Sequence, residues 1–562
     1  MLHTIDREAL GASRLTTFAS TKEIANELDA ISRQWNTAYK TVPVVGRNRQ
    51  PFEIVQEHFA AAEPIPSDIA FDRIGEFAMF WGRIPLDRLI AYFVRYCDQD
   101  PSIEYLDLGT PMFKLGSGST YDQICKVQMS QTAQLAAATV GAAIVDMGEN
   151  DIGCHPDDYG GMLRHVVTKD IKMSDHAEKV LSVLLERLKK NSGLNHTAIS
   201  CSLVRPPTAF VGTGLSAFDQ ACSPEILTAV QALGVTLSTD NLPACVNFSL
   251  GTHVGPHNGD SPLEEYIRTI SSKQDLYVVA AAGNEGGAGH AARCTLEGSE
   301  PEFLTIRTGP LCEQLLVEFW WDDLVTLDLA IDVDVWETTV SPSGTRRTNH
   351  GSLRIDRNTI GTLSVAPAGL PRSMIMHSLF GSRCKGNFSC VAFAISGKNG
   401  SQLPSLEVDL KLQATALPAN QKAFVNGWIV VAESDPLTAS TAFIEGGAEG
   451  SMMVPASDPT VLSVAGLDNS GNIWKGSSRG PAAVYDTTSM MKPSPLMAHV
   501  SYLGSDVGTS FASPRACADA IATLADPNKR TQCRDALSLL IETYGLHNLP
   551  SWNARFGYHK AQ

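Results

Sequence analysis

The chain has 562 residues, of which 43% are hydrophobic and 19% charged, and its formal net charge at pH 7 is −16. This length predicts two or three domains, and the composition excludes a disordered or fibrous chain. The acidic balance argues against a nucleic-acid partner, whose phosphates need clustered Lys and Arg side chains. Because no stretch approaches the ~18 consecutive apolar residues of a membrane-spanning helix, we expect no membrane partner.

The first residues, MLHTIDREALGASRL, lack the basic start and the uninterrupted apolar core of a secretory signal. We therefore expect a cytoplasmic protein. The 12 cysteines follow no metal-ligand spacing, which favours reduced structural thiols, with a structural zinc site as the alternative. We expect no cofactor, and calcium dependence stays open.

Residues 1–130 are predicted to form a partly helical accessory region without obvious chemistry. Ser20 and Glu23 fit a capping box, and the apolar residues that follow on one helical face are Ile24, Leu28, Ile31 and Trp35. A second helix is predicted to start at Pro85, with an apolar stripe of Leu86, Leu89, Ile90, Phe93 and Val94.

From 131 to 300, short apolar runs alternate with helical stretches, which indicates a parallel sheet flanked by helices. Three runs are predicted as buried strands: AAIVDMG at 142–148, NFSLG at 247–251 and LYVVAAAGN at 276–284. A helix is predicted at 176–190, between the first two strands. In such sheets the active site lies beyond the carboxyl ends of the strands.

From 301 to 445 the pattern changes, and apolar residues occupy every second position in runs such as 327–335 and 406–412. This alternation predicts half-buried antiparallel strands. We therefore expect an antiparallel β-sandwich, inserted into the α/β domain. The aspartates of these strands could bind calcium, although a solvated sheet face is the simpler interpretation.

From 446 to 562 the helix-and-strand pattern returns, and this segment is expected to complete the α/β domain. VLSVAGLD at 461–468 predicts a strand, and a helix is predicted at 510–524, entered through GTSFASP at 508–514. A serine at a helix start lies where unpaired N–H groups and the helix dipole stabilise negative charge. Ser510 is therefore a candidate nucleophile, although a role as N-cap would also explain it.

Asn284 ends the third predicted strand, in the run AAGN at 281–284. Its side-chain amide could donate a hydrogen bond to the negative oxygen of a tetrahedral intermediate. Taken alone, Gly283 and Asn284 could equally form an ordinary turn.

Together these motifs resemble those of the subtilase family of serine proteases. GTSFASP is similar to the family's nucleophile motif, VVAAAGNEG at 278–286 to its oxyanion motif, and NFSLGT at 247–252 to the strand that pairs with the substrate backbone. The stretch 454–481 resembles the segment that precedes the nucleophile. The resemblance covers about 135–300 and 450–562.

The resemblance implies a serine endopeptidase with an Asp-His-Ser triad, formed here by Asp146, His176 and Ser510. Asp146 also ends an apolar strand, where a carboxylate needs a partner. Asn284 would hold the oxyanion. The residues implied to bind the peptide or protein substrate are Ser249, Leu250, Gly251, Ala282 and Gly283.

The sequence departs from the family pattern next to both Asp146 and His176. Met147 follows Asp146, where Ser or Thr is usual. The residue after His176 is not glycine, and Lys179 stands where the family has a second histidine. His165 is therefore kept as an alternative base.

GTHVGPHNGDSPLEE at 251–265 resembles the subgroup that contains clostridial spore-germination proteases, in which a jelly-roll sandwich is likewise inserted before the nucleophile. The family resemblance also permits a prodomain, so residues 1–130 are expected to restrain the protease or assist its folding. A docking module for a regulatory partner is the alternative.

Three other functions fit parts of the sequence. A pseudoprotease would use the same fold for binding, and the altered surroundings of His176 favour it. An esterase is disfavoured, because Ser510 does not lie in a GxSxG elbow. The sandwich could also be a sugar- or protein-binding module that dominates the function.

Overall fold

The computed structural model describes residues 138–149, 163–166, 172–191, 197–204, 223–273, 275–322, 329–341, 344–356, 374–380, 388–397, 402–414, 417–433, 441–485, 492, 494–547, 553 and 557–561. Before residue 138 it describes residues 4–6, 41–48, 69–74, 77–85, 103–107 and 113–114. The helix predicted at 20–35 lies outside these residues, as does the one predicted from Pro85, except for Pro85 itself.

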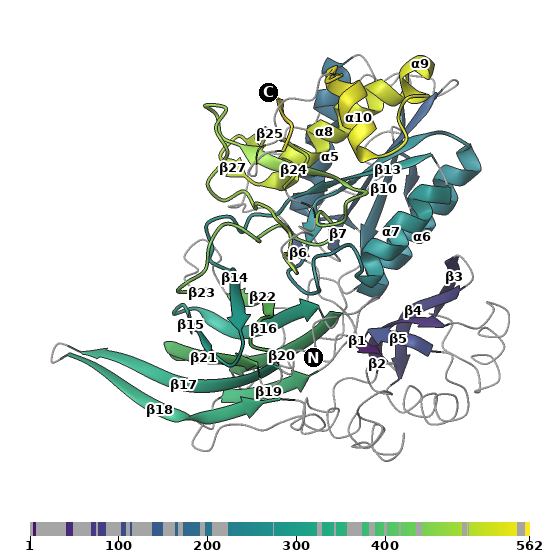
Figure 1. The fold of residues 1–562 in the computed structure, drawn as a ribbon. Helices are drawn as coiled ribbons and strands as arrows, with labels where there is room; N and C mark the ends of the chain where they lie inside the picture. Colours follow the sequence, from purple (N-terminus) through teal and green to yellow (C-terminus); the bar gives the residue numbers. More distant parts are fainter. Residues whose placement is uncertain are drawn as a thin grey trace.

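A nine-stranded sheet lies at the centre of an α/β body (Figure 1). Its strands follow the order β28 (His559–Ala561), β25 (Met497–Val500), β24 (Leu462–Leu467), β13 (Leu276–Ala281), β11 (Ala244–Phe248), β7 (Val140–Glu149), β10 (Thr197–Val204) and β8 (Leu163–Val166). These neighbours are parallel, and β9 (Lys172–Met173) pairs antiparallel with the end of β7. The strands predicted at 142–148, 276–284 and 461–468 correspond to β7, β13 and β24, since a sheet buried on both faces gives continuous apolar runs. The run predicted at 247–251 instead covers the end of β11 and the separate strand β12 (Leu250–Gly251).

Helices cover both faces of this sheet. On one face, α5 (Asp175–Lys190), α8 (Thr509–Leu524) and α10 (Ala536–Tyr544) share an apolar core with Ala142 and Ile144 of β7. On the other, α6 (Ser223–Asp240) and α7 (Pro262–Lys273) share a core with Ala143 and Val145. Alternate side chains of β7 therefore face opposite helix layers. The short helix α9 (Pro527–Arg530) follows α8.

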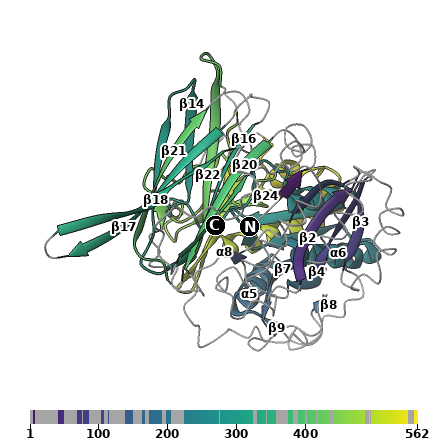
Figure 2. The same ribbon diagram turned by 90° about the horizontal axis from the view of Figure 1, so that it is seen from below.

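A β-sandwich is inserted between β13 and β24 (Figure 2). One antiparallel sheet has the order β14 (Ala291–Glu297), β22 (Lys422–Glu433), β16 (Cys312–Asp322), β20 (Phe388–Gly397) and β19 (Met374–Phe380). The other has the order β18 (Gly344–Ile355), β17 (Leu329–Ser341), β21 (Leu406–Ala414), β15 (Glu302–Arg307) and β23 (Ala442–Phe443). The two sheets enclose one apolar core. The predicted fold class, a helix-flanked parallel sheet with an inserted sandwich, is thus confirmed.

The aspartates of the sandwich face basic side chains on neighbouring strands. Oδ1 of Asp332 lies 2.9 Å from Nη1 of Arg354, and Oδ2 of Asp409 lies 3.0 Å from Nη2 of Arg347. In the described part of the chain, no group of three or more His, Cys, Asp or Glu side chains could hold a metal ion. These surface pairs balance charge on a solvated sheet face and contribute little stability.

Buried contacts join the sandwich to the α/β body. Glu318 of β16 accepts a hydrogen bond from the backbone N–H of Gly255 at 3.0 Å. Trp428 of β22 stacks on His257, with ring centroids 4.0 Å apart. Because Gly255 and His257 follow the predicted substrate strand closely in sequence, the sandwich buttresses that segment.

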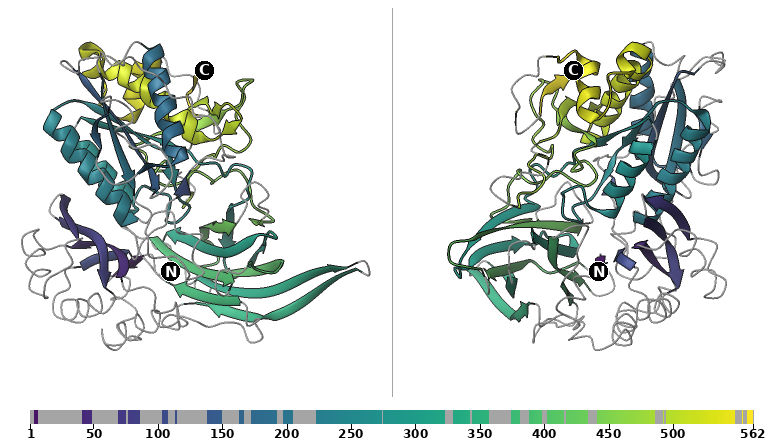
Figure 3. Two further views of the ribbon diagram at one scale, coloured as in Figure 1. Left: turned by 180° about the vertical axis from the view of Figure 1, so that it is seen from behind. Right: turned by 45° about the vertical axis from the view of Figure 1, so that its right-hand side comes forward.

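The described part of the N-terminal region is a five-stranded antiparallel sheet, which the sequence analysis did not predict. Its order is β1 (Thr4–Asp6), β5 (Ile103–Asp107), β2 (Thr41–Asn48), β4 (Phe77–Pro85) and β3 (Ala70–Ile74). It lies beside α6 and α7 (Figure 3). Trp81 donates to Thr228 at 3.0 Å, and the hydroxyl of Tyr266 donates to Asp72 at 2.8 Å. Apolar burial and these hydrogen bonds together dock the sheet on the two helices.

None of the described helices is long and apolar enough to cross a membrane. The described cysteines are buried free thiols, namely Cys201, Cys245, Cys294, Cys312, Cys390, Cys517 and Cys533.

A buried charge network holds α5 against α8. Asp519 of α8 accepts hydrogen bonds from Nε of Arg187 at 2.7 Å, from Asn191 at 2.7 Å and from the hydroxyl of Tyr544 at 2.9 Å. Burial by itself raises the pKa of Asp519. Interactions with His499, Arg187 and Asn191 outweigh burial and hold that pKa well below its usual range.

Asp519→Asn should therefore destabilise the protein near neutral pH by ~3–5 kcal/mol, because Arg187 loses its buried counter-charge. A carboxylate whose pKa is lowered by folding stabilises the protein above its unfolded pKa of about 4, and this contribution is lost as the pH falls toward the folded pKa. The difference in Tm between wild type and variant, measured by circular dichroism, should shrink as the pH falls below about 4. A difference independent of pH would contradict the ionic role.

Candidate active site

Asp146 and His176 come together although they are 30 residues apart in sequence. Oδ1 of Asp146 lies 2.9 Å from Nδ1 of His176, and it also accepts the backbone N–H of Met147 at 2.7 Å. Asp146 is fully buried and His176 is 9% exposed. A carboxylate beside Nδ1 favours the tautomer with its proton on that nitrogen, which leaves Nε2 as the acceptor.

The start of α5 places His176 at this position. Ser174 is the N-cap, and its hydroxyl accepts the backbone N–H of Ala177 at 3.1 Å. The N–H of Ser174 donates to the carbonyl of Met147 at 3.3 Å. The helix start is thereby joined to the residue after Asp146, which the sequence analysis did not foresee.

Ser510 lies in the first turn of α8, and the residue after it, Phe511, contacts the ring of His176. The rings of His176 and Phe511 have centroids 6.3 Å apart. Ser510 is fully buried, and among the described residues neither its Oγ nor Nε2 of His176 has a hydrogen-bond partner. Because buried polar atoms are usually paired, two unpaired ones on neighbouring segments indicate a functional site.

Thr509 fixes the orientation of the Asn284 side chain. Oδ1 of Asn284 accepts the backbone N–H of Thr509 at 2.9 Å and its hydroxyl at 3.0 Å. Because the backbone N–H of Thr509 can only donate, the Asn284 side-chain atom that it contacts must be the oxygen and not the nitrogen. The Nδ2 group of Asn284 is therefore the end that remains able to donate. Thr509 was not singled out from the sequence, although it stands within GTSFASP.

The loop before Asn284 requires glycine at position 283. Gly283 has φ of +114°, and a Cβ there would lie 2.6 Å from Oγ of Ser478 and 2.7 Å from Cγ of Met453. Its N–H donates to the Thr509 hydroxyl at 3.2 Å, and its carbonyl accepts the N–H of Ser478 at 2.9 Å. Both backbone groups of Gly283 are therefore used in hydrogen bonds that hold the loop. Contact between Gly283 and the substrate stays a prediction.

Ala282 is likewise tied into the protein by its backbone. Its N–H donates to the carbonyl of Val464 at 2.9 Å, and its carbonyl accepts the N–H of Met453 at 3.0 Å. Ala282 is fully buried. Its predicted role in substrate binding is untested by these contacts.

The predicted substrate strand contacts both the segment that contains Ser510 and the N-terminal region. The hydroxyl of Ser249 donates to the carbonyl of Ser510 at 3.1 Å. Leu250 and Gly251 form β12 (Leu250–Gly251), which pairs antiparallel with β6 (Phe113–Lys114). In Figure 1, β6 lies with the α/β body and away from β1 to β5. A strand from the N-terminal region thus occupies the edge at which a peptide was expected to bind.

The alternative base His165 lies on β8, at the edge of the parallel sheet. Strand β10 separates β8 from β7, and His165 is in register with Ser200 of β10. The geometry therefore joins Asp146 to His176 and leaves His165 on a different strand.

Glu285, the residue after Asn284, interacts with two histidines, His290 and His253. Burial by itself raises the pKa of Glu285, but His290, whose Nδ1 is 2.5 Å away, outweighs it and lowers the pKa to about 2. Burial lowers the pKa of His253 to about 3, and within the described residues neither ring nitrogen of His253 has a hydrogen-bond partner. At neutral pH the Glu285 carboxylate is thus charged and paired with His290, and the His253 imidazole, which follows β12, is neutral.

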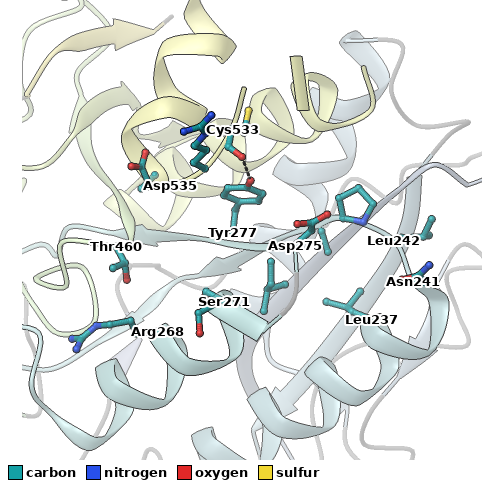
Figure 4. A pocket seen from close by; sticks show the side chains of 16 residues that line it. Leu237, Asn241, Leu242, Arg268, Ser271, Asp275, Tyr277, Thr460, Cys533 and Asp535 are labelled. Carbon is teal, nitrogen blue, oxygen red and sulfur yellow. Dashed lines mark hydrogen bonds between the residues drawn. The ribbon is translucent and has the colours of Figure 1, made fainter. Parts of the chain in front are cut away.

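A pocket of about 630 Å³ lies elsewhere (Figure 4). It opens at the amino ends of β11 and β13, where Ala244 and Leu276 line it together with Tyr277 and Cys533. Asp146 and Asn284 lie at the opposite, carboxyl ends of the strands. The pocket is therefore separate from the candidate active site.

Comparisons with known proteins place the fold. No known protein-family profile matches the chain, and neither does any curated protein sequence. Among solved structures, the CspB protease of Clostridium perfringens is similar with a TM-score of 0.51 and 18% identity, over 76% of this chain and 93% of that one. The nisin leader peptidase NisP of Lactococcus lactis has a TM-score of 0.29 and 12% identity, over 75% and 85% of the two chains. At these identities the CspB likeness shows the fold alone, and the NisP likeness adds nothing to it.

Gly283→Ala should destabilise the protein through both backbone strain, ~1–3 kcal/mol, and steric overlap, ~1–3 kcal/mol. The matched control is Gly344→Ala, because Gly344 has φ of +128° but nothing would lie within 4 Å of a Cβ added there. The control should show the strain alone. Equal losses of Tm in thermal unfolding would contradict the close packing of the loop.

Proposed function

We propose that this chain is a serine endopeptidase that cleaves peptide bonds in protein substrates. The observation that carries the proposal is the 2.9 Å contact between Asp146 and Nδ1 of His176, next to a helix start at which the Ser510 hydroxyl is unpaired. The fold shared with the CspB protease is compatible with it. Nucleophile, base and orienting carboxylate are the three roles that acyl transfer requires.

In the proposed mechanism, Oγ of Ser510 attacks the carbonyl carbon of the scissile bond while Nε2 of His176 takes up its proton. His176 then gives that proton to the leaving amine, which leaves an acyl-enzyme on Ser510. Water attacks the acyl group, again with His176 as base, and releases the acid. Asp146 keeps the ring oriented and stabilises its protonated form.

Two donors are proposed for the oxyanion. One is Nδ2 of Asn284, whose other amide end is held by Thr509. The second is the backbone N–H of Ser510, which belongs to the first turn of α8 and lacks an intrahelical acceptor. Both are part of a rigid frame, so they need no reorganisation as charge develops.

The substrate is proposed to bind as an extended strand along 249–251. Support comes from β6, which pairs antiparallel with β12 at this edge. Backbone hydrogen bonds would then supply affinity and side-chain pockets selectivity.

The same contact supports a restraining role for the N-terminal region. While β6 pairs with Leu250 and Gly251, a substrate strand cannot occupy that edge. The N-terminal sheet on α6 and α7 would keep the competing strand at a high effective concentration. The alternative, a docking module for a regulatory partner, predicts no competition with substrate.

Ser510→Ala should lower kcat by ~10⁶ without changing the thermal unfolding profile. His176→Ala should lower kcat by a similar factor and also lower Tm, because the buried Asp146 loses its side-chain hydrogen-bond partner. His165→Ala is the matched control and should keep near-wild-type activity. A peptide library, with products identified by mass spectrometry, provides the assay. Retained cleavage in Ser510→Ala would refute the proposed nucleophile, and a defect in His165→Ala alone would move the base.

Asn284→Ala should lower kcat by ~10²–10³ with little change in KM, because the amide acts on the transition state. Thr509→Val should cause a smaller loss, since the backbone N–H of Thr509 still holds Oδ1 of Asn284. Thr509→Ser keeps the hydroxyl and should behave as wild type. An unchanged kcat in Asn284→Ala would reduce Asn284 to a turn residue.

Phe113→Pro and Lys114→Pro remove backbone N–H groups from β6 and should raise kcat/KM for peptide substrates in the full-length chain. Lys114→Ala, which keeps the backbone, is the control and should leave kcat/KM unchanged. If the proline variants are no more active than Lys114→Ala, β6 does not compete with substrate and the docking interpretation is favoured.

A further inference from the structure

A buried ion pair links the helix of His176 to the segment that leads to Ser510. Nζ of Lys179 lies 2.9 Å from Oδ2 of Asp506 and 2.6 Å from Oδ2 of Asp175. The side chains of Lys179 and Asp506 are only 8% and 2% exposed. Asp506 belongs to β27 (Asp506–Val507), which forms a hairpin with β26 (Tyr502–Leu503).

The ion pair of Lys179 and Asp506 lies close in sequence to both His176 and Ser510. Lys179 lies three residues after His176, so the two side chains project from the same side of the first turns of α5. Asp506 lies four residues before Ser510, with only Val507 and Gly508 between it and the start of α8. The pair therefore joins the two segments at the end where the catalytic side chains lie.

A second tie joins α5 directly to α8, far from the site. Arg187 and Asp519 lie 2.7 Å apart, 11 residues after His176 and nine after Ser510. At a rise of about 1.5 Å per residue, this tie is roughly 15 Å further along the helices. It can set how α5 packs on α8, but a tie near the site is needed to set how His176 lies relative to Ser510.

The ion pair also accounts for a departure in the sequence. Lys179 stands where the resembled family has a second histidine. Burial lowers the pKa of Lys179, but hydrogen bonds and charge interactions with Asp175 and Asp506 outweigh burial, and the net pKa is raised. The ammonium group therefore stays charged across the neutral range and keeps both carboxylates in place.

We infer that Lys179 and Asp506 are positioning residues, whose ion pair holds His176 in register with the Ser510 hydroxyl. The inference rests on the proposed peptidase function. Neither residue is assigned a contact with substrate. Because proton transfer depends on sub-ångström placement, a shift of about 1 Å in His176 costs about 10²-fold in rate.

Lys179→Met and Asp506→Asn should therefore lower kcat by ~10–100-fold with little change in KM, because substrate binding at 249–251 is not altered. Lys179→Arg keeps the charge and should recover most of the activity. Arg187→Met is the matched control: it breaks the distant tie between α5 and α8, should lower Tm, and should leave kcat near that of wild type.

Nuclear magnetic resonance of ¹⁵N-histidine-labelled protein provides a readout that does not depend on activity. The ring signals of His176 are assigned by their loss in His176→Gln. They should shift in Lys179→Met and Asp506→Asn but not in Arg187→Met. A role confined to overall stability would leave these signals unchanged in every folded variant.

A kcat loss in Lys179→Met no greater than in Arg187→Met would overturn the inference, and so would unchanged His176 signals. If Lys179→Met does not fold, Asp506→Asn and Lys179→Arg decide by the same criteria. If wild type shows no Ser510-dependent cleavage, the proposed function fails, and the His176 signals alone decide whether the pair positions that ring.

Discussion

Asp146 places a carboxyl group in a strand whose other central residues are apolar, where such a group is stable only with hydrogen-bond partners. His176 supplies the partner side chain at 2.9 Å, and Met147 supplies an N–H. This requirement brings the start of α5 to the carboxyl end of β7. Ser174 then caps the helix and bonds back to the strand. The geometry of the candidate site follows from satisfying one buried carboxyl group.

The remaining parts of the protein converge on the same end of the sheet. Thr509 links Asn284 to the start of α8, and Ser249 links the predicted substrate strand to Ser510. The sandwich supports the segment after that strand through Glu318. From the other side, β6 of the N-terminal region pairs with β12. Catalysis and restraint are thus proposed for one edge, where a peptide strand and β6 compete.

Local periodicity was enough to predict the sheet, the flanking helices α5 and α8, and the sandwich, because strands buried on both faces read as continuous apolar runs and strands buried on one face alternate. The N-terminal sheet was missed, since it forms by pairings between distant segments, such as Arg47 with Tyr105. The candidate site shows the same limit. Motifs indicated Asp146, His176, Asn284 and Ser510, whereas the contact between Lys179 and Asp506 spans more than 300 residues and leaves no local pattern.

The central claim is that Ser510 is a nucleophile activated by His176. A fluorophosphonate probe reacts with an activated serine hydroxyl, and mass spectrometry of the digested protein identifies the modified residue. The measurement is made on the native full-length chain and on Lys114→Pro, in which the competing strand is weakened. The account predicts modification at Ser510, and its loss in His176→Ala. Modification of a different serine, or none at Ser510 in either protein, would contradict it.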